Sequence, residues 1–165
     1  MTIRALAAEE VTALRDELIA LCAQAFFGTP WHEPPRGALR TVDRLLGRAS
    51  AGQRGFRCVA AYDPEGALTG FAAGWRDTAL SGGPEAFELA ELVVAPAHQG
   101  QGLGRALHDT VLARAPRPRL LMTLDVPGLR DRYEAWGWRV VERRLPEKDP
   151  RQFVVMREDD RPPGG

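Results

Sequence analysis

Residues 87–115, FELAELVVAPAHQGQGLGRALHDTVLARA, decide how this chain folds. An apolar segment, Phe87–Val94, is followed by a glycine-rich turn, Gln99–Gly104, and then by Gly104–Ala115, in which leucine and valine recur at helical spacing. Glycine has no Cβ, and the first N–H groups of a helix have no acceptor within the helix, so backbone donors converge at such a turn. The stretch therefore predicts a strand, a turn suited to the diphosphate of a nucleotide, and a helix.

Two other nucleotide-binding motifs do not fit this turn. The P-loop requires Lys and Ser or Thr after its last glycine, where this chain has Arg105 and Ala106. The dinucleotide fingerprint requires G-x-G-x-x-G, whereas Gly100, Gly102 and Gly104 alternate by two. Glycine-rich turns also close ordinary strand–helix connections, so the flanking sequence has to decide between a binding site and a plain connection.

Hydrophobic periodicity predicts the remaining elements. Helices are predicted at 8–27, 38–49 and 127–136, and strands at 56–62, 67–76, 119–126, 138–143 and 153–157. Asp63-Pro64-Glu65-Gly66 predicts a hairpin turn between the first two of these strands. The order of elements predicts a mixed α/β sheet in a single domain, residues 1–158, and the polar residues 159–165 predict a disordered tail.

Composition excludes several classes of function. The chain has 165 residues, 44% of them hydrophobic and 27% charged, as expected for one soluble globular domain. Its 22 basic and 22 acidic side chains give a net charge of zero, which argues against nucleic acid as the main partner. No apolar run approaches the ~20 residues of a membrane span, and no secretory segment is visible, so we expect a cytoplasmic protein. Cys22 and Cys58 are predicted to be buried free thiols, and no metal site is predicted.

The turn and its flanks resemble the GNAT superfamily of N-acetyltransferases. Its pattern Q/R-x-x-G-x-G/A matches Gln99–Gly104, with Glu91–Pro96 before it and Leu103–Leu107 after it as in that superfamily. Tyr133–Trp138, YEAWGW, is similar to the later Y-x-x-x-G-F/W segment. The resemblance covers Phe87–Trp138 and implies a mostly antiparallel central sheet flanked by helices, with a splayed parallel strand pair at the cofactor site. It also implies transfer of an acetyl group from acetyl-CoA to a primary amine of a small molecule or peptide, by direct attack in a ternary complex.

The resemblance also implies which residues contact the cofactor. The main chain of the strand before the turn would pair with the pantetheine arm through Leu92, Val93 and Val94. The turn would hold the diphosphate, and its residues are Gln99, Gly100, Gln101, Gly102, Leu103, Gly104 and Arg105. Tyr133 is similar to the tyrosine that protonates the departing thiolate. Val126 is a departure, because the family often has an Asn there to contact pantetheine, and Asp125 lies one residue away.

The acceptor amine must be neutral to attack a thioester, so a carboxylate base is expected. Glu88 and Glu91 are both candidates, and in a regular strand they point to opposite faces, so both cannot face the acceptor. Each also suits the role of a salt-bridged strand residue. Trp31, Glu33 and Trp75 are predicted to bind the acceptor, because a Trp face and a carboxylate suit a cationic amine.

Three alternatives stay open at this stage. The chain could be a non-catalytic acyl-CoA-binding sensor or interaction module, although Tyr133 and the two strand carboxylates count against that interpretation. The donor could be a longer acyl group, or the acceptor an oxygen. Dimers are frequent in the family, so a homodimer is open as well.

Overall fold

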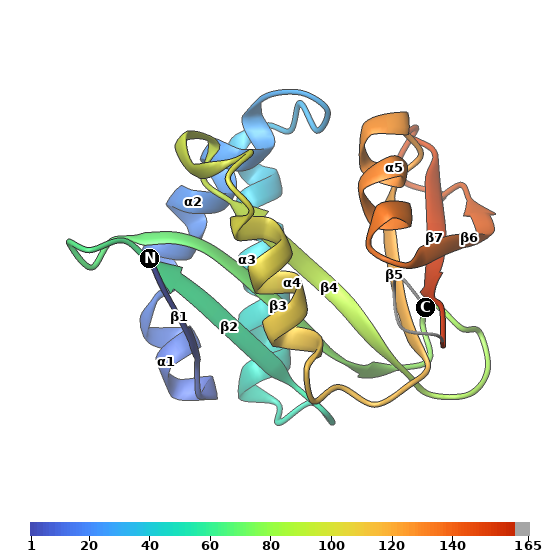
Figure 1. The fold of residues 1–165 in the computed structure, drawn as a ribbon, viewed down its shortest axis with the longest axis horizontal. Coiled ribbons are helices and arrows are strands. Elements are labelled where there is room, and N and C mark those ends of the chain that lie inside the picture. The colour runs from blue at the N-terminus through green and yellow to red at the C-terminus, as the bar shows by residue number, and fades with distance from the viewer. Residues whose placement is uncertain (161–165) are drawn as a thin grey trace. The chain divides into compact units, whose positions relative to one another are not determined.

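The computed structural model describes residues 1–160, and over these residues the strands form one sheet in the order β1-β2-β3-β4-β5-β7-β6 (Figure 1). The strands are β1 (Thr2–Ala5), β2 (Arg57–Tyr62), β3 (Leu68–Asp77), β4 (Ala86–Val94), β5 (Arg119–Leu124), β6 (Trp138–Arg144) and β7 (Phe153–Glu158). The helices are α1 (Ala8–Ala13), α2 (Arg15–Phe27), α3 (Pro35–Ser50), α4 (Leu103–Leu112) and α5 (Pro127–Ala135), with a short 3₁₀ turn at Pro96–His98. Strand β2 pairs antiparallel with β1 and β3, and β7 pairs antiparallel with β5 and β6, whereas β4 and β5 run parallel, so the predicted mixed, mostly antiparallel fold is confirmed.

The described chain forms two compact units, each built from two stretches of sequence. The first contains Met1–Trp75 and Glu91–Arg114, and the second contains Arg76–Ala90 and the chain from Ala115 onward. The boundary between Ala90 and Glu91 therefore falls inside β4. Within residues 1–160, no helix combines the length and the apolar character that crossing a membrane requires.

In the first unit, a hairpin of β2 and β3 is closed by the predicted turn. The Asp63 carboxylate accepts hydrogen bonds from the N–H groups of Glu65 and Ala67, both at 2.9 Å, and Gly66 takes a φ of 85° that favours glycine. Helices α3 and α4 lie on opposite faces of these strands (Figure 1). At Gly70, β3 closely approaches α4 and β4, because a Cβ added there would lie 2.9 Å from Leu107 Cδ1 and 2.9 Å from the Val93 carbonyl oxygen.

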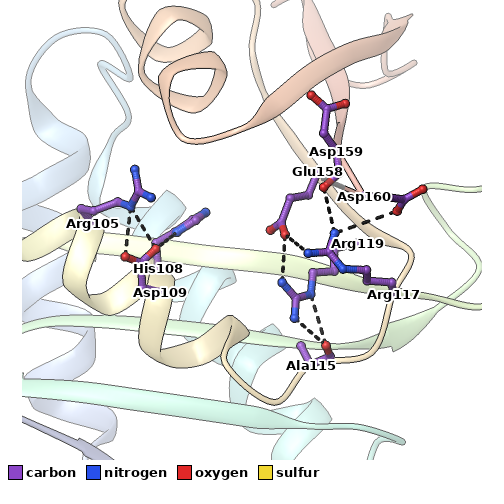
Figure 2. Close-up of polar contacts among 9 residues, drawn as sticks. All are labelled: Arg105, His108, Asp109, Ala115, Arg117, Arg119, Glu158, Asp159 and Asp160. Atoms are coloured by element: carbon purple, nitrogen blue, oxygen red, sulfur yellow. Dashed lines mark hydrogen bonds and ion pairs between the residues drawn. The ribbon is translucent and has the colours of Figure 1, made fainter. Parts of the chain in front are cut away.

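In the second unit, β7 lies between β5 and β6 and pairs with both. The Glu158 carboxylate at the end of β7 forms ion pairs with Arg119 at 2.9 Å and Arg117 at 3.1 Å, and Arg119 also donates to the Ala115 carbonyl at 2.7 Å (Figure 2). Asp159, the first residue of the predicted tail, donates its N–H to the Gly137 carbonyl at 2.8 Å. The rest of that predicted tail, residues 161–165, lies outside the described residues.

Two elements differ from the sequence prediction. The segment predicted as one helix, 8–27, is two helices, because Leu14 takes φ −93° and ψ 13° between α1 and α2. The strand β1 was not predicted; it pairs antiparallel with β2 at the edge of the sheet, and its four residues are mostly exposed. The prediction of buried free thiols is confirmed, since Cys22 and Cys58 are both buried and unbridged.

Candidate active site

The glycine-rich turn joins β4 to α4 in the first unit. Gly100 and Gly102 take φ values of 77° and 83°, in the left-handed region that favours glycine. A Cβ at either position would have no heavy atom within 4 Å, so the backbone here borders open space. The Gln99 side chain is turned back on the strand, where its Nε2 donates to the Val94 carbonyl at 3.0 Å. The turn is thus braced from within while its backbone is exposed to a ligand.

The first turn of α4 has donors for an anion. Gly102 is the N-cap residue and has no side chain to cap the helix, and the Ala106 N–H donates to the Gly102 carbonyl at 3.1 Å. The amides of the residues between them, at the positive end of the helix dipole, have no carbonyl acceptor within the helix. Uncapped amides beside glycines that leave open space fit the diphosphate of coenzyme A, as the sequence predicted for Gly102, Leu103 and Gly104.

The side chain of Arg105 is engaged along α4. Its Nε donates to both carboxylate oxygens of Asp109, at 2.9 and 3.0 Å (Figure 2). The Nδ1 of His108 lies 2.8 Å from the same carboxylate, and His108 is 3% exposed. The predicted contact of Arg105 with a diphosphate therefore rests on its main chain.

Glu91 lies on the buried face of β4. Glu91 and Val93 are buried, whereas Leu92 and Val94, which alternate with them, are half-buried, so Glu91 and Val93 share one face of the strand. The Glu91 carboxylate is 9% exposed and forms an ion pair with Arg44 of α3. Burial raises the pKa of Glu91, Arg44 lowers it, and Glu33 raises it; the net direction is upward.

The predicted acceptor residues Glu33 and Trp75 belong to the same neighbourhood as Glu91. Arg44 lies over the ring of Trp75, with Cζ 6.0 Å from the centroid, and Phe56 stacks on that ring at 6.3 Å. Glu33 acts electrostatically on Glu91, and both carboxylates raise the pKa of the Cys22 thiol after the larger effect of burial. The structure thus brings Glu33, Glu91 and Trp75 together, in the first unit.

The loop before α3 is folded back against α2. The Trp31 ring packs on Phe26 with centroids 5.8 Å apart, and the Glu33 N–H donates to the Phe26 carbonyl at 2.8 Å. The side chain of Glu33 covers the first turn of α3, where a Cβ on Gly37 would lie 2.5 Å from its Oε2. Gly37 is therefore needed to let this carboxylate sit at the positive end of α3.

Glu88 and Tyr133 belong to the second unit. Glu88 is 6% exposed, and its Oε2 accepts a hydrogen bond from the Leu80 N–H at 2.8 Å, so this carboxylate ties down the loop after β3. The ring of Tyr133, on α5, makes edge contacts with Trp136 at 5.6 Å and Trp138 at 6.4 Å. Gly137, just after the C-cap of α5, takes a φ of 97°, in the left-handed region that favours glycine.

Sequence reasoning missed Arg44. Its partner Glu91 is 47 residues away in the chain, so no local pattern links them. The available signal was the recurrence of arginine every four residues at 36, 40, 44 and 48, which places the four on neighbouring turns of one helix. Asp125, considered in place of the family's Asn, forms an ion pair with Arg130 at 2.9 Å. Over residues 1–160, no group of three or more His, Cys, Asp or Glu side chains could hold a metal ion.

Comparisons with known proteins bear on this geometry. No curated protein matches the chain. A crystal structure of histone acetyltransferase HPA2 and related acetyltransferase from Corynebacterium glutamicum is similar, with a TM-score of 0.68, 19% identity, and coverage of 100% of this chain and 98% of that one. A ribosomal-protein-alanine N-acetyltransferase from Brucella melitensis has a TM-score of 0.68 and 18% identity over 96% of this chain and 99% of its own. Naa20 from Chaetomium thermophilum, in complex with a bisubstrate analogue, has a TM-score of 0.62 and 19% identity over 96% and 86%.

These structures share the fold of this chain. The model of the "Acetyltransferase (GNAT) family" matches residues 17–138, from α2 through the glycine-rich turn to the first residue of β6. The chain therefore belongs to the GNAT family of acetyltransferases.

Proposed function

We propose that this protein transfers an acetyl group from acetyl-CoA to the primary amine of a small molecule or peptide, with Glu91 as the base and Tyr133 as the acid. The observation that carries the proposal is the position of Glu91. It is a buried carboxylate with a raised pKa, on the strand that leads directly into the glycine-rich turn. Glu33 and Trp75, two of the residues predicted to bind the acceptor, belong to its neighbourhood.

In this proposal the amides at the start of α4 would bind the diphosphate, and the main chain of Leu92–Val94 would orient the pantetheine arm. When bound, acetyl-CoA supplies the acetyl group as a reactive thioester. Glu91 removes a proton from the acceptor ammonium, so that the nitrogen lone pair can form the new C–N bond. Tyr133 would donate its hydroxyl proton to the sulfur as the C–S bond breaks, so that coenzyme A leaves as the thiol. The nitrogen would lose its second proton as the amide forms, and this proton would restore the Tyr133 hydroxyl.

Glu91 is favoured over Glu88 as the base because their environments differ. A raised pKa makes a carboxylate a better proton acceptor near neutral pH, and this applies to Glu91. The Oε2 of Glu88 already accepts a hydrogen bond from the Leu80 N–H, and a structural role explains this contact. Of the two faces of β4, the proposal therefore assigns the acceptor to the face that carries Glu91.

The test is release of coenzyme A thiol from acetyl-CoA with a panel of amines. The buried Cys22 and Cys58 keep the protein's own background low in a thiol assay. Glu91→Gln and Tyr133→Phe are each expected to lower kcat by roughly 10²-fold or more. Their matched controls are Glu88→Gln, whose amide oxygen can still accept from Leu80, and Tyr62→Phe, since Tyr62 is the chain's other tyrosine.

Equal losses for Glu91→Gln and Glu88→Gln would remove the assignment of the base. An unchanged rate for Tyr133→Phe across the pH range would remove the acid role. Tight binding of acetyl-CoA with no thiol release for any amine would contradict acetyl transfer and favour a non-catalytic sensor of acyl-CoA.

A further inference from the structure

Helix α3 carries four arginines at intervals of four residues: Arg36, Arg40, Arg44 and Arg48. In an α-helix each such step moves about 6 Å along the axis and about 40° around it, so the four form one slowly turning row. Like charges at this spacing destabilise a helix. The chain as a whole is neutral, so this row is a local concentration of positive charge.

The arginines at one end of the row make polar contacts with neighbouring side chains, and those at the other end make none within residues 1–160. Arg44 forms its ion pair with Glu91, and Arg48 donates to Gln53 at 3.0 Å and lies 5.3 Å from the centroid of Trp75. Arg36 and Arg40 are exposed and make no ion pair or hydrogen bond with any residue in the described part of the chain. The two open guanidinium groups therefore lie on the turns of α3 between Glu33 and Arg44.

Arg44 keeps donors available for a second partner. Its Nη2 donates to Glu91, while the side chain remains 54% exposed, and no described residue accepts from its Nε or Nη1. Arg40 lies one turn away on the same row. Two guanidinium groups at this spacing can bind one carboxylate or phosphate through charge-assisted hydrogen bonds.

The balance of charge also decides which acceptor is attracted. Because Arg44 compensates Glu91, the carboxylate does not attract a polycation, and Arg36 and Arg40 repel one. A positive neighbourhood moreover lowers the pKa of a bound amine, which increases the neutral fraction that can attack. This differs from the expectation, drawn from Trp and Glu residues alone, of a site for a simple cationic amine.

We propose that the acceptor is a primary amine carrying a carboxylate or a phosphate, and that Arg40 and Arg44 bind this oxyanion beside Glu91. The inference rests on the proposed acetyl transfer and deepens it by naming the class of acceptor. Arg36, farther round the helix, adds attraction at longer range.

The experiment uses pairs of amines that differ in the anionic group: phenethylamine with phenylalanine, and ethanolamine with phosphoethanolamine, with spermidine as the polycation. Values of kcat/KM are measured for the wild type, for Arg40→Gln, and for Arg143→Gln, a control in which an exposed arginine of β6 is removed. We expect the wild type to prefer the anionic member of at least one pair by roughly tenfold or more. Arg40→Gln should abolish most of that preference, and Arg143→Gln should leave it intact; the favoured pair distinguishes carboxylate from phosphate.

Calorimetric titration of phenylalanine and phosphoethanolamine into the same three proteins gives a readout independent of turnover. Binding that weakens in Arg40→Gln but not in Arg143→Gln supports the oxyanion site even if acetyl transfer fails. Preference for spermidine, or for phenethylamine and ethanolamine, which lack the anionic group, overturns the inference while leaving acetyl transfer standing. Absence of binding and of preference for either anionic amine at millimolar concentration also overturns it.

Discussion

Replacing Gly70 by alanine is expected to destabilise the first unit. The new methyl group would lie 2.9 Å from Leu107 Cδ1 and 2.9 Å from the Val93 carbonyl oxygen. Leu107 is fully buried, so its side chain has no solvent to move into, and the second contact is backbone. Gly70 has an ordinary φ, so alanine is not excluded by backbone conformation, and the cost is steric.

The size of the effect follows from two opposing terms. Overpacking a well-filled core costs about 1–3 kcal/mol, whereas alanine in a strand gains about 0.5–1 kcal/mol over glycine through the unfolded chain. The difference runs from about 0 to 2.5 kcal/mol, and because one of the two contacts is backbone we expect a loss of about 1–2 kcal/mol in the free energy of unfolding. For a chain of this length that corresponds to a fall in Tm of roughly 2–8 °C.

Urea denaturation followed by tryptophan fluorescence and circular dichroism measures this loss. Gly47→Ala is the matched control, because Gly47 lies within α3 with nothing within 4 Å of its Cβ position, and it should stabilise by up to about 1 kcal/mol. Repeating Gly70→Ala in a Leu107→Ala background removes one of the two contacts and shows which one dominates. A Gly70→Ala protein as stable as the wild type would refute the close approach of β3, Val93 and α4.

Three further outcomes are expected. Arg44→Gln removes the interaction that lowers the pKa of Glu91, so the acidic limb of kcat/KM against pH should move to higher pH. When the pKa of a carboxyl group is raised in the folded state, the stability that the group contributes is lost as pH rises through that pKa. Denaturation should therefore show a larger loss in the free energy of unfolding of Arg44→Gln, relative to the wild type, at pH 8 than at pH 5. Gly102→Ala forces a left-handed φ of 83° on a residue with a Cβ, which should lower the free energy of unfolding by about 1–2 kcal/mol and raise KM for acetyl-CoA in steady-state assays. Burial raises the pKa of Cys58 to about 12 and raises that of Cys22 as well, so a thiol reagent at pH 8 should label neither until urea unfolds the chain; rapid labelling of the native protein would contradict this.

Local patterns were sufficient for most of the fold. The hairpin of β2 and β3 was predicted because its turn has its own chemistry, in which the Asp63 carboxylate and Gly66 act within five residues. The break at Leu14 was not predicted, since Val11 and Leu18 on either side are both fully buried and continue the helical spacing across it. The strand β1 has too few residues to show a period, and its pairing with β2 stabilises it from outside.

The candidate site was predictable where its signal is local. Gly100 and Gly102 take the left-handed conformations that a turn of this type requires. The different surroundings of Glu88 and Glu91 were not predictable, because they depend on the Leu80 N–H and on Arg44, which only the folded chain brings to them. The expectation of a cationic acceptor was drawn without Arg44, an arginine from a different element that compensates the charge of Glu91.

The position of β7 between β5 and β6 has a consequence for how the chain emerges from the ribosome. The strands β5 and β6 are synthesised before β7, yet each takes its antiparallel partner from β7. Until Phe153–Glu158 has been translated, β5 and β6 each have an edge whose backbone groups lack their hydrogen-bonding partner, and such edges are prone to associate with other chains. A nascent chain that stalls ahead of Phe153 should therefore need a chaperone to stay out of aggregates.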